Sequence, residues 1–124
     1  MLIFVAEPNE DLRVGLQMYL QNEVDMRVVG MSVQAKGLVV QLEASEADVL
    51  VLDWNLPGAS MPNLLADIRR LESPPKTIVL AVRPEVEEEA LDAGADSFVC
   101  KDRPPDELWE VIRSLRMTRL NSTE

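Results

Sequence analysis

The sequence predicts an α/β fold in which five parallel strands alternate with five helices. Five short apolar runs recur at similar spacing, and each is nearly continuous, as in strands that are covered on both faces of a parallel sheet. The stretches between these runs carry apolar residues at helical spacing. Right-handed crossovers place such helices on both faces of a doubly wound sheet, and 124 residues fit one such domain.

The five predicted strands are short segments of mainly apolar residues. In chain order they are Leu2–Ala6, Arg27–Met31, Val49–Leu52, Thr77–Val82 and Ser97–Cys100. Ligands of doubly wound sheets bind at the carboxyl ends of the strands, beside the point where the strand order reverses. The residues that follow these segments are therefore the first candidates for a functional site.

The first three predicted helices follow from apolar stripes. The first stripe comes after Asn9, a favourable N-cap residue, and consists of Leu12, Leu16, Tyr19 and Leu20. The second and third stripes are Ala35, Leu38, Val39 and Leu42, and Leu64, Leu65, Ile68 and Leu71. These positions repeat at intervals of three and four residues, which is the spacing of one helix face.

The last two predicted helices have start or stop signals in the sequence as well as helical periodicity. The fourth stripe is Val86, Ala90 and Ala93, with Pro84 near its start and Gly94 as a stop signal. The fifth is Leu108, Val111, Ile112 and Leu115, with Pro104 and Pro105 at its entrance. From about Thr118 the chain becomes polar, and we expect a frayed end there.

The composition excludes several kinds of site. There is no histidine, so histidine bases and histidine-ligated metals are excluded. The single cysteine, Cys100, excludes an internal disulfide, a thiolate zinc site and an iron–sulfur cluster, and we expect it to be a small core residue. A formal charge of −10 makes nucleic acid and anionic membranes poor partners. With no signal peptide and no apolar membrane span, the sequence predicts a cytoplasmic protein.

Three ionisable residues stand just past predicted strands. Glu7 follows the first strand, Asp53 ends the third, and Lys101 follows the fifth. If the strand order is 2-1-3-4-5, the first and third strands are neighbours and the two carboxylates lie side by side. They then repel unless a cation lies between them or they share a proton. Lys101 could pair with Asp53, or with a phosphoryl group that Asp53 accepts.

The residues resemble the receiver domains of two-component response regulators. The segment VLVLDWNLPG resembles the receiver phospho-acceptor loop, with Asp53 as acceptor and Asn55 offering its backbone carbonyl to a metal. The segment GADSFVCKD resembles the approach to the fifth receiver strand, with Lys101 as the phosphate-contacting lysine and Phe98 as the switch aromatic. The segment VAEPNEDLRVGL and the Lys-Asp pair resemble the subgroup whose output domain is a helix-turn-helix.

The resemblance implies a flavodoxin-like fold with strand order 2-1-3-4-5 and a role in phosphorelay signalling without turnover on a metabolite. It covers residues 1–119 as the receiver domain and leaves 120–124 as a polar tail. It implies magnesium held by Glu7, Asp53 and the backbone of Asn55, and a sensor histidine kinase or another signalling protein as partner.

Three positions depart from the receiver pattern. Pro8 stands where receivers have a second acidic residue, so a metal ligand is missing. Ala81 replaces the Ser or Thr whose hydroxyl contacts the phosphoryl group, and the branched Val82 follows where a small residue is usual. We therefore expect weak magnesium binding. Two interpretations stay open: phosphorylation through Asp53, and an atypical receiver that acts by protein contacts, in which Lys101 and Asp53 hold the site shut.

One surface is a candidate interface. An acidic run includes Glu85 and Glu88, and basic residues follow at Arg113 and Arg116. An acidic run is also what a solvated helix face looks like. Trp109 is expected outside the apolar stripe, where it could anchor a partner. With Phe98, these residues predict a homodimer face formed by the fourth helix, the fifth strand and the fifth helix.

Two other functional classes fit the residues less well. A phosphotransferase or hydrolase with an aspartate nucleophile would want a second aspartate two residues after Asp53, where Asn55 stands. A flavin binder needs a phosphate-binding loop after the first strand, and the Glu-Pro-Asn-Glu sequence there would repel phosphate.

Overall fold

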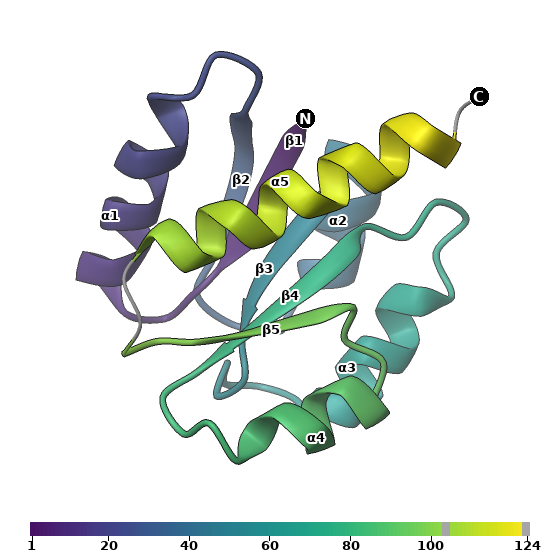
Figure 1. Ribbon diagram of the computed structural model, residues 1–124. Coiled ribbons are helices and arrows are strands. Elements are labelled where there is room, and N and C mark those ends of the chain that lie inside the picture. Colours follow the sequence, from purple (N-terminus) through teal and green to yellow (C-terminus); the bar gives the residue numbers. More distant parts are fainter. Residues whose placement is uncertain (103–104, 123–124) are drawn as a thin grey trace.

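The computed structural model describes the backbone of residues 1–102 and 105–122, and the side chains of residues 1–102 and 106–115. The five strands are β1 (Leu2–Ala6), β2 (Arg27–Ser32), β3 (Val49–Asp53), β4 (Lys76–Ala81) and β5 (Ser97–Cys100). The five helices are α1 (Glu10–Gln21), α2 (Leu38–Ser45), α3 (Met61–Arg69), α4 (Val86–Asp92) and α5 (Pro105–Ser122). Strands and helices alternate along the described part of the chain, as the sequence predicts (Figure 1).

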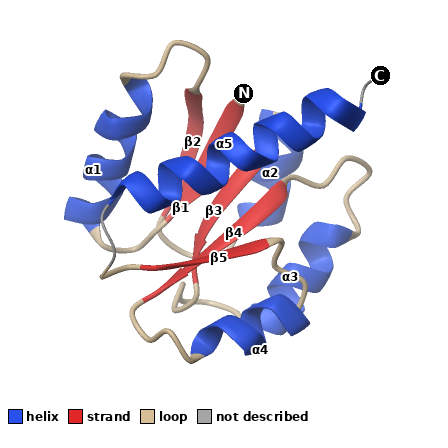
Figure 2. Cartoon of the chain, viewed as in Figure 1, coloured by secondary structure: helices blue, strands red, loops and turns tan. Residues whose placement is uncertain are grey.

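All strand pairs are parallel, and their order in the sheet is β2-β1-β3-β4-β5. This is the flavodoxin-like order, so the predicted fold is confirmed. Helices α1 and α5 pack on one face of the sheet, and α2, α3 and α4 on the other (Figure 2). The central strands β1 and β3 therefore lie side by side, and their carboxyl ends meet at one edge.

The central strands are covered on both faces, which explains their unbroken apolar runs. All five residues of β3 are buried, and so is β4 after Lys76. The outer strand β2 has no buried residue, because it lies at the edge of the sheet. Within β2, Gly30 lies against the ring of Phe4: a Cβ atom added there would come within 2.5 Å of the ring. The close approach of β2 to β1 requires a glycine at this position.

Local hydrogen bonds explain where the helices begin. Asn9 caps α1, since its side chain accepts a hydrogen bond from Leu12 N at 2.9 Å, as the sequence predicts. Helix α2 begins only at Leu38, after Gly37 in the left-handed region with φ 78°. Ala35 therefore precedes the helix, although it is buried like Leu38 and Leu42 of its predicted stripe, while Val39 is partly buried.

Several element ends differ from the sequence expectation. Strand β4 ends at Ala81, so Val82 lies outside the strand, while β3 includes Asp53 itself. Helix α5 continues to Ser122, past residue 119, and the polar composition after Thr118 does not end it. The predicted division between the domain and a tail at 120–124 stays a prediction, since helix content alone does not define a domain boundary.

The expectation that Trp109 lies outside the core is wrong. Trp109 is 7% exposed and belongs to the core cluster between the sheet and helices α1 and α5. Leu108, Trp109 and Ile112 are all buried there. The apolar stripe locates the centre of a buried helix face but not its width. Trp109 precedes Ile112 by three residues, so the two side chains lie on the same face.

Candidate functional site

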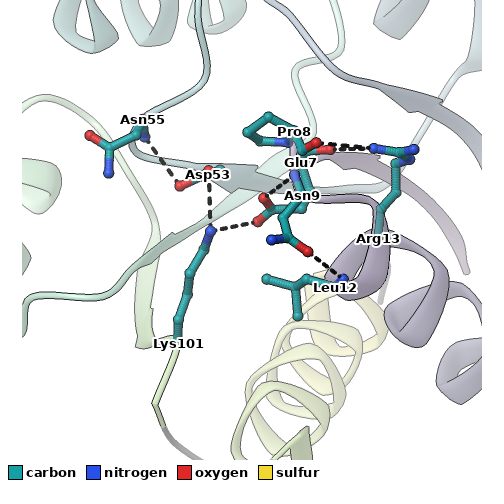
Figure 3. Close-up of polar contacts among 8 residues, drawn as sticks. All are labelled: Glu7, Pro8, Asn9, Leu12, Arg13, Asp53, Asn55 and Lys101. Atoms are coloured by element: carbon teal, nitrogen blue, oxygen red, sulfur yellow. Dashed lines mark hydrogen bonds and ion pairs between the residues drawn. The ribbon is translucent and has the colours of Figure 1, made fainter.

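The three predicted site residues meet at the carboxyl edge of the sheet. Glu7 follows β1 and donates its backbone N–H to Ser32 O at 3.0 Å. Asp53 is the last residue of β3, and Lys101 follows β5 and donates its N–H to Ala81 O at 2.7 Å. The Lys101 side chain points from the end of β5 toward both carboxylates (Figure 3). Residues separated by up to 94 positions therefore form one cluster.

The Lys101 ammonium group bridges the two carboxylates. Its Nζ lies 2.8 Å from Glu7 Oε1 and 3.1 Å from Asp53 Oδ2. Glu7 is fully buried, Asp53 is 3% exposed, and the Lys101 side chain is 16% exposed. Ion pairs shielded from water to this extent are screened far less by salt than surface pairs.

Backbone N–H groups bind the remaining carboxylate oxygens. Asn9 N donates to Glu7 Oε2 at 3.0 Å, and Asn55 N donates to Asp53 Oδ1 at 3.1 Å. In each carboxylate, one oxygen thus accepts a hydrogen bond from a backbone N–H two residues further along the chain, and the other contacts the Lys101 ammonium. Glu7 Oε1 is buried and has the Lys101 ammonium as its ion-pair partner at 2.8 Å, with no backbone N–H donor.

The surroundings shift the proton affinities of two of these groups. Burial raises the pKa of the Glu7 carboxyl, and the contacts with Lys101 and Asn9 offset this only in part. Burial lowers the pKa of Lys101, but its contacts with Glu7 and Asp53 outweigh that effect, and the net pKa is raised. Lys101 therefore carries its full positive charge at neutral pH.

The three altered positions surround this cluster without adding a polar side-chain atom to it. Pro8 is exposed, and its carbonyl and that of Glu7 accept hydrogen bonds from Arg13 at 3.5 and 3.0 Å. Ala81 is buried at the end of β4, next to the backbone of Lys101. Val82 is 60% exposed, and its carbonyl accepts a hydrogen bond from the Cys100 thiol at 3.1 Å. Cys100 is buried, as predicted for a core residue.

The donor set does not fit a magnesium ion in this arrangement. Magnesium needs near-octahedral oxygen ligands at about 2.0–2.1 Å and gives up its water reluctantly. The two carboxylate oxygens that face each other across the site are both in contact with the Lys101 ammonium. Among the described residues, no three acidic or cysteine side chains are grouped so that they could hold a metal. Pro8 supplies no third carboxylate.

The predicted interface residues lie on α4, β5 and α5, apart from Glu85, which is the N-cap residue of α4. Glu85 and Glu88 are exposed, and Phe98 is half-buried against the small core cluster under α4. Arg113 is half-exposed, with its guanidinium 4.9 Å from the centroid of the Trp109 ring and 3.7 Å from Glu110. The side chain of Arg116 lies outside the described residues.

No helix in the described part of the chain is both long and apolar enough to cross a lipid bilayer.

Comparison with known proteins identifies the family. The family model of the response regulator receiver domain matches residues 3–113. The transcriptional regulatory protein DesR of Bacillus subtilis is 30% identical over 115 residues, which are 91% of this chain and 57% of that protein. The nitrate/nitrite response regulator protein NarL of Escherichia coli is 26% identical over 112 residues, which are 89% of this chain and 52% of that protein. The chain thus spans about half the length of these relatives.

Solved structures agree on the fold. A LuxR-family DNA-binding response regulator from Staphylococcus aureus superposes with a TM-score of 0.81 at 25% identity, covering 92% of this chain and 97% of that one. The isolated REC domain of RcsB from Salmonella enterica serovar Typhimurium gives a TM-score of 0.84 at 24% identity, covering 94% and 88%. The relatives that the chain resembles include NarL and a LuxR-family response regulator. With the strand order and the Asp53–Lys101 pair, these matches establish that the chain belongs to the response regulator receiver domain family.

Proposed function

We propose that this receiver domain signals through protein contacts, and that Asp53 is a phospho-acceptor position that is phosphorylated poorly. One observation carries the proposal: the Lys101 ammonium is bound between Glu7 and Asp53. In a working phosphoryl-acceptor site, the acceptor carboxylate must be free to attack, and cations must neutralise the oxygens of the transferred group. Here the cation of the site is already engaged by two buried carboxylates.

The altered positions support the same conclusion. A phosphoryl group on Asp53 would lie beside the buried carboxylate of Glu7, and the two anions would repel. Ala81 has no hydroxyl group to donate to a phosphoryl oxygen, and Pro8 has no carboxylate to bind a metal. Receiver domains generally bind magnesium at the phosphorylation site. We propose that magnesium binding by Glu7, Asp53 and the Asn55 backbone is weak in this chain.

The proposed role is that of a signalling module, with no turnover on a metabolite. The alternative of an aspartate-nucleophile phosphotransferase or hydrolase is not favoured, because Asn55 cannot act as a general acid in the place of the second aspartate. Asn55 instead holds Asp53 Oδ1 through its backbone N–H at 3.1 Å.

The proposed partners are a sensor histidine kinase or another signalling protein, and a second copy of the chain. The similar proteins include DNA-binding regulators, whereas this domain alone is strongly acidic, and we propose no direct contact with nucleic acid. The proposed self-association face is formed by α4, β5 and α5, with exposed acidic side chains on α4 and Arg113 on α5. Trp109 is not included in this proposed face, because its side chain is buried in the core.

Incubation with acetyl phosphate and magnesium, followed by intact mass measurement, tests the proposal. In the labelling reaction, a carboxylate oxygen of Asp53 would accept the phosphoryl group from acetyl phosphate, and acetate would leave. We expect the mass of the native domain to stay nearly unchanged. Asp53→Asn is the control for labelling elsewhere on the chain. Stoichiometric labelling that Asp53→Asn abolishes would show a working phosphorylation switch and would overturn the proposal.

A further inference from the structure

All four carboxylate oxygens of Glu7 and Asp53 have positively polarised neighbours from the chain itself. Asn9 N and Asn55 N each donate to one oxygen, at 3.0 and 3.1 Å. The Lys101 ammonium lies at 2.8 and 3.1 Å from the other two. The chain itself thus supplies a hydrogen-bond donor or an ion-pair partner to each of these oxygens.

The position of the ammonium matters because both carboxylates are withdrawn from water. Two adjacent buried carboxylates repel each other, and each loses its hydration, so the pair in its ionised state needs a cation for the fold to be stable. A lysine ammonium supplies a compact positive charge at the end of a long side chain. Lys101 reaches both carboxylates from β5, although β4 lies between β5 and β3.

The same position is the one that a divalent cation would need. A cation ligated by Glu7 Oε1 and Asp53 Oδ2 would have to lie between these oxygens, where Nζ is in contact with both. Two positive charges cannot share that place, because they repel each other at contact distance. A metal could enter only if Lys101 left two ion pairs that water barely reaches.

We propose that the Lys101 side chain is the permanent counterion of the Glu7–Asp53 pair and takes the place of a metal ion in this receiver. The proposal deepens the proposed function, since it names what occupies the site of phosphoryl acceptance. It concerns the protein before any phosphoryl group arrives. It is therefore tested without a phosphoryl donor, so its failure and the failure of the proposed function are separate results.

Thermal unfolding with magnesium chloride or with a chelator is the test. The melting temperature of the native protein should change by less than about 1 °C between the two conditions. Lys101→Met keeps much of the side-chain volume but removes the charge, and it should lower the melting temperature in chelator. Magnesium should then raise the melting temperature of this variant by about 5 °C or more, because it replaces the lost charge. Lys36→Met, at an exposed lysine, is the matched control and should show neither effect.

A second variant covers the case in which Lys101→Met does not fold in chelator. Glu7→Gln combined with Lys101→Met leaves a single ionised carboxylate, so this double variant should fold, melt at a higher temperature than Lys101→Met, and lose the magnesium response. The proposal is overturned by a native protein that magnesium stabilises, by Lys101→Met without a magnesium response, or by a double variant that recovers no stability.

Discussion

The rings of Tyr19 and Trp109 pack edge to face, with centroids 6.3 Å apart and an interplanar angle of 72°. The contact joins α1 to α5 above the sheet, between elements 90 residues apart in the chain. The Arg113 guanidinium also lies over the Trp109 ring, 4.9 Å from its centroid. Trp109 is therefore an internal packing residue. Arg113 already contacts two residues of its own helix, Trp109 and Glu110.

Trp109→Ala should destabilise the fold and leave the oligomeric state unchanged. Truncation of a buried aromatic side chain typically costs about 3–5 kcal/mol, because contacts are lost and a cavity remains. Denaturant unfolding monitored by circular dichroism measures the change, and Trp109→Phe, which keeps much of the ring, is the control with a smaller loss. An unchanged free energy of unfolding would mean that the indole does not pack as described.

The ionisation of Tyr19 should depend on Asp106. Burial is the largest cause that raises the pKa of Tyr19, and the hydrogen bond from its hydroxyl to Asp106 Oδ1 at 2.9 Å adds to the effect. Tyr19 is the single tyrosine, so the ultraviolet absorbance of its phenolate reports on this group alone. The midpoint should lie above 10.0 in the native protein and fall in Asp106→Asn.

The raised pKa of Tyr19 also determines how the free energy of unfolding changes with pH. A raised pKa means that the folded state favours the neutral phenol, so its contribution to stability is complete below pH 10.0 and is lost as the pH rises through the folded-state value. Asp106→Asn should reduce this loss. A midpoint that is the same in both proteins would contradict the hydrogen bond as a cause.

Gly30 should tolerate no side chain. A Cβ atom there would lie within 2.5–2.8 Å of two ring carbons of Phe4, which is itself 2% exposed and has little room to move. Gly30→Ala should therefore lower the free energy of unfolding by about 1–3 kcal/mol, the usual cost of overpacking a core. Gly15→Ala is the control, since a Cβ atom at Gly15 meets nothing within 4 Å. Stability equal to that of the control would show that the β1–β2 pair can separate freely at this point.

Restoring two family features should restore phosphorylation in part. Pro8→Asp adds a carboxylate next to Glu7, and Ala81→Thr adds a hydroxyl donor at the end of β4. Together they should increase labelling by acetyl phosphate at least about 10-fold, since a single well-placed donor is typically worth more than this in transition-state stabilisation. Intact mass gives the measurement, and addition of Asp53→Asn to the pair should abolish the label. Equal labelling of the native protein and the pair would mean that neither position limits the reaction.

Self-association through α4, β5 and α5 should be present without a phosphoryl donor and should weaken as salt is added. Exposed ion pairs at an interface rim are screened over about 10 Å at 0.1 M ionic strength. Glu88→Lys and Arg113→Glu should each shift the native domain toward monomer in size exclusion with light scattering, and the two changes combined should restore part of the association. Glu43→Lys, on α2, is the control. A native domain that is monomeric at high concentration would remove this face as an interface.

The alternation of apolar runs and helical stripes determined the fold, because burial on two faces and burial on one face leave different periodicities in a sequence. The same reasoning located Glu7, Asp53 and Lys101, since each comes directly after or at the end of a strand. Position relative to a strand end is a local property, so the sequence by itself was sufficient for it. The strand order came from resemblance to receivers, because no local pattern encodes it.

Only the tertiary structure shows which of these residues form ion pairs and which side chains are buried. The distances from Lys101 to Glu7 and Asp53 depend on how β1, β3 and β5 are placed across the sheet, and no sequence interval reports that. The burial of Trp109 depends on the width of the α5 face that packs against the sheet and α1. The periodicity of the sequence marks only the centre of that face. Local patterns specify which way a side chain faces; charge pairing and the extent of burial are set by neighbours that are distant in the chain.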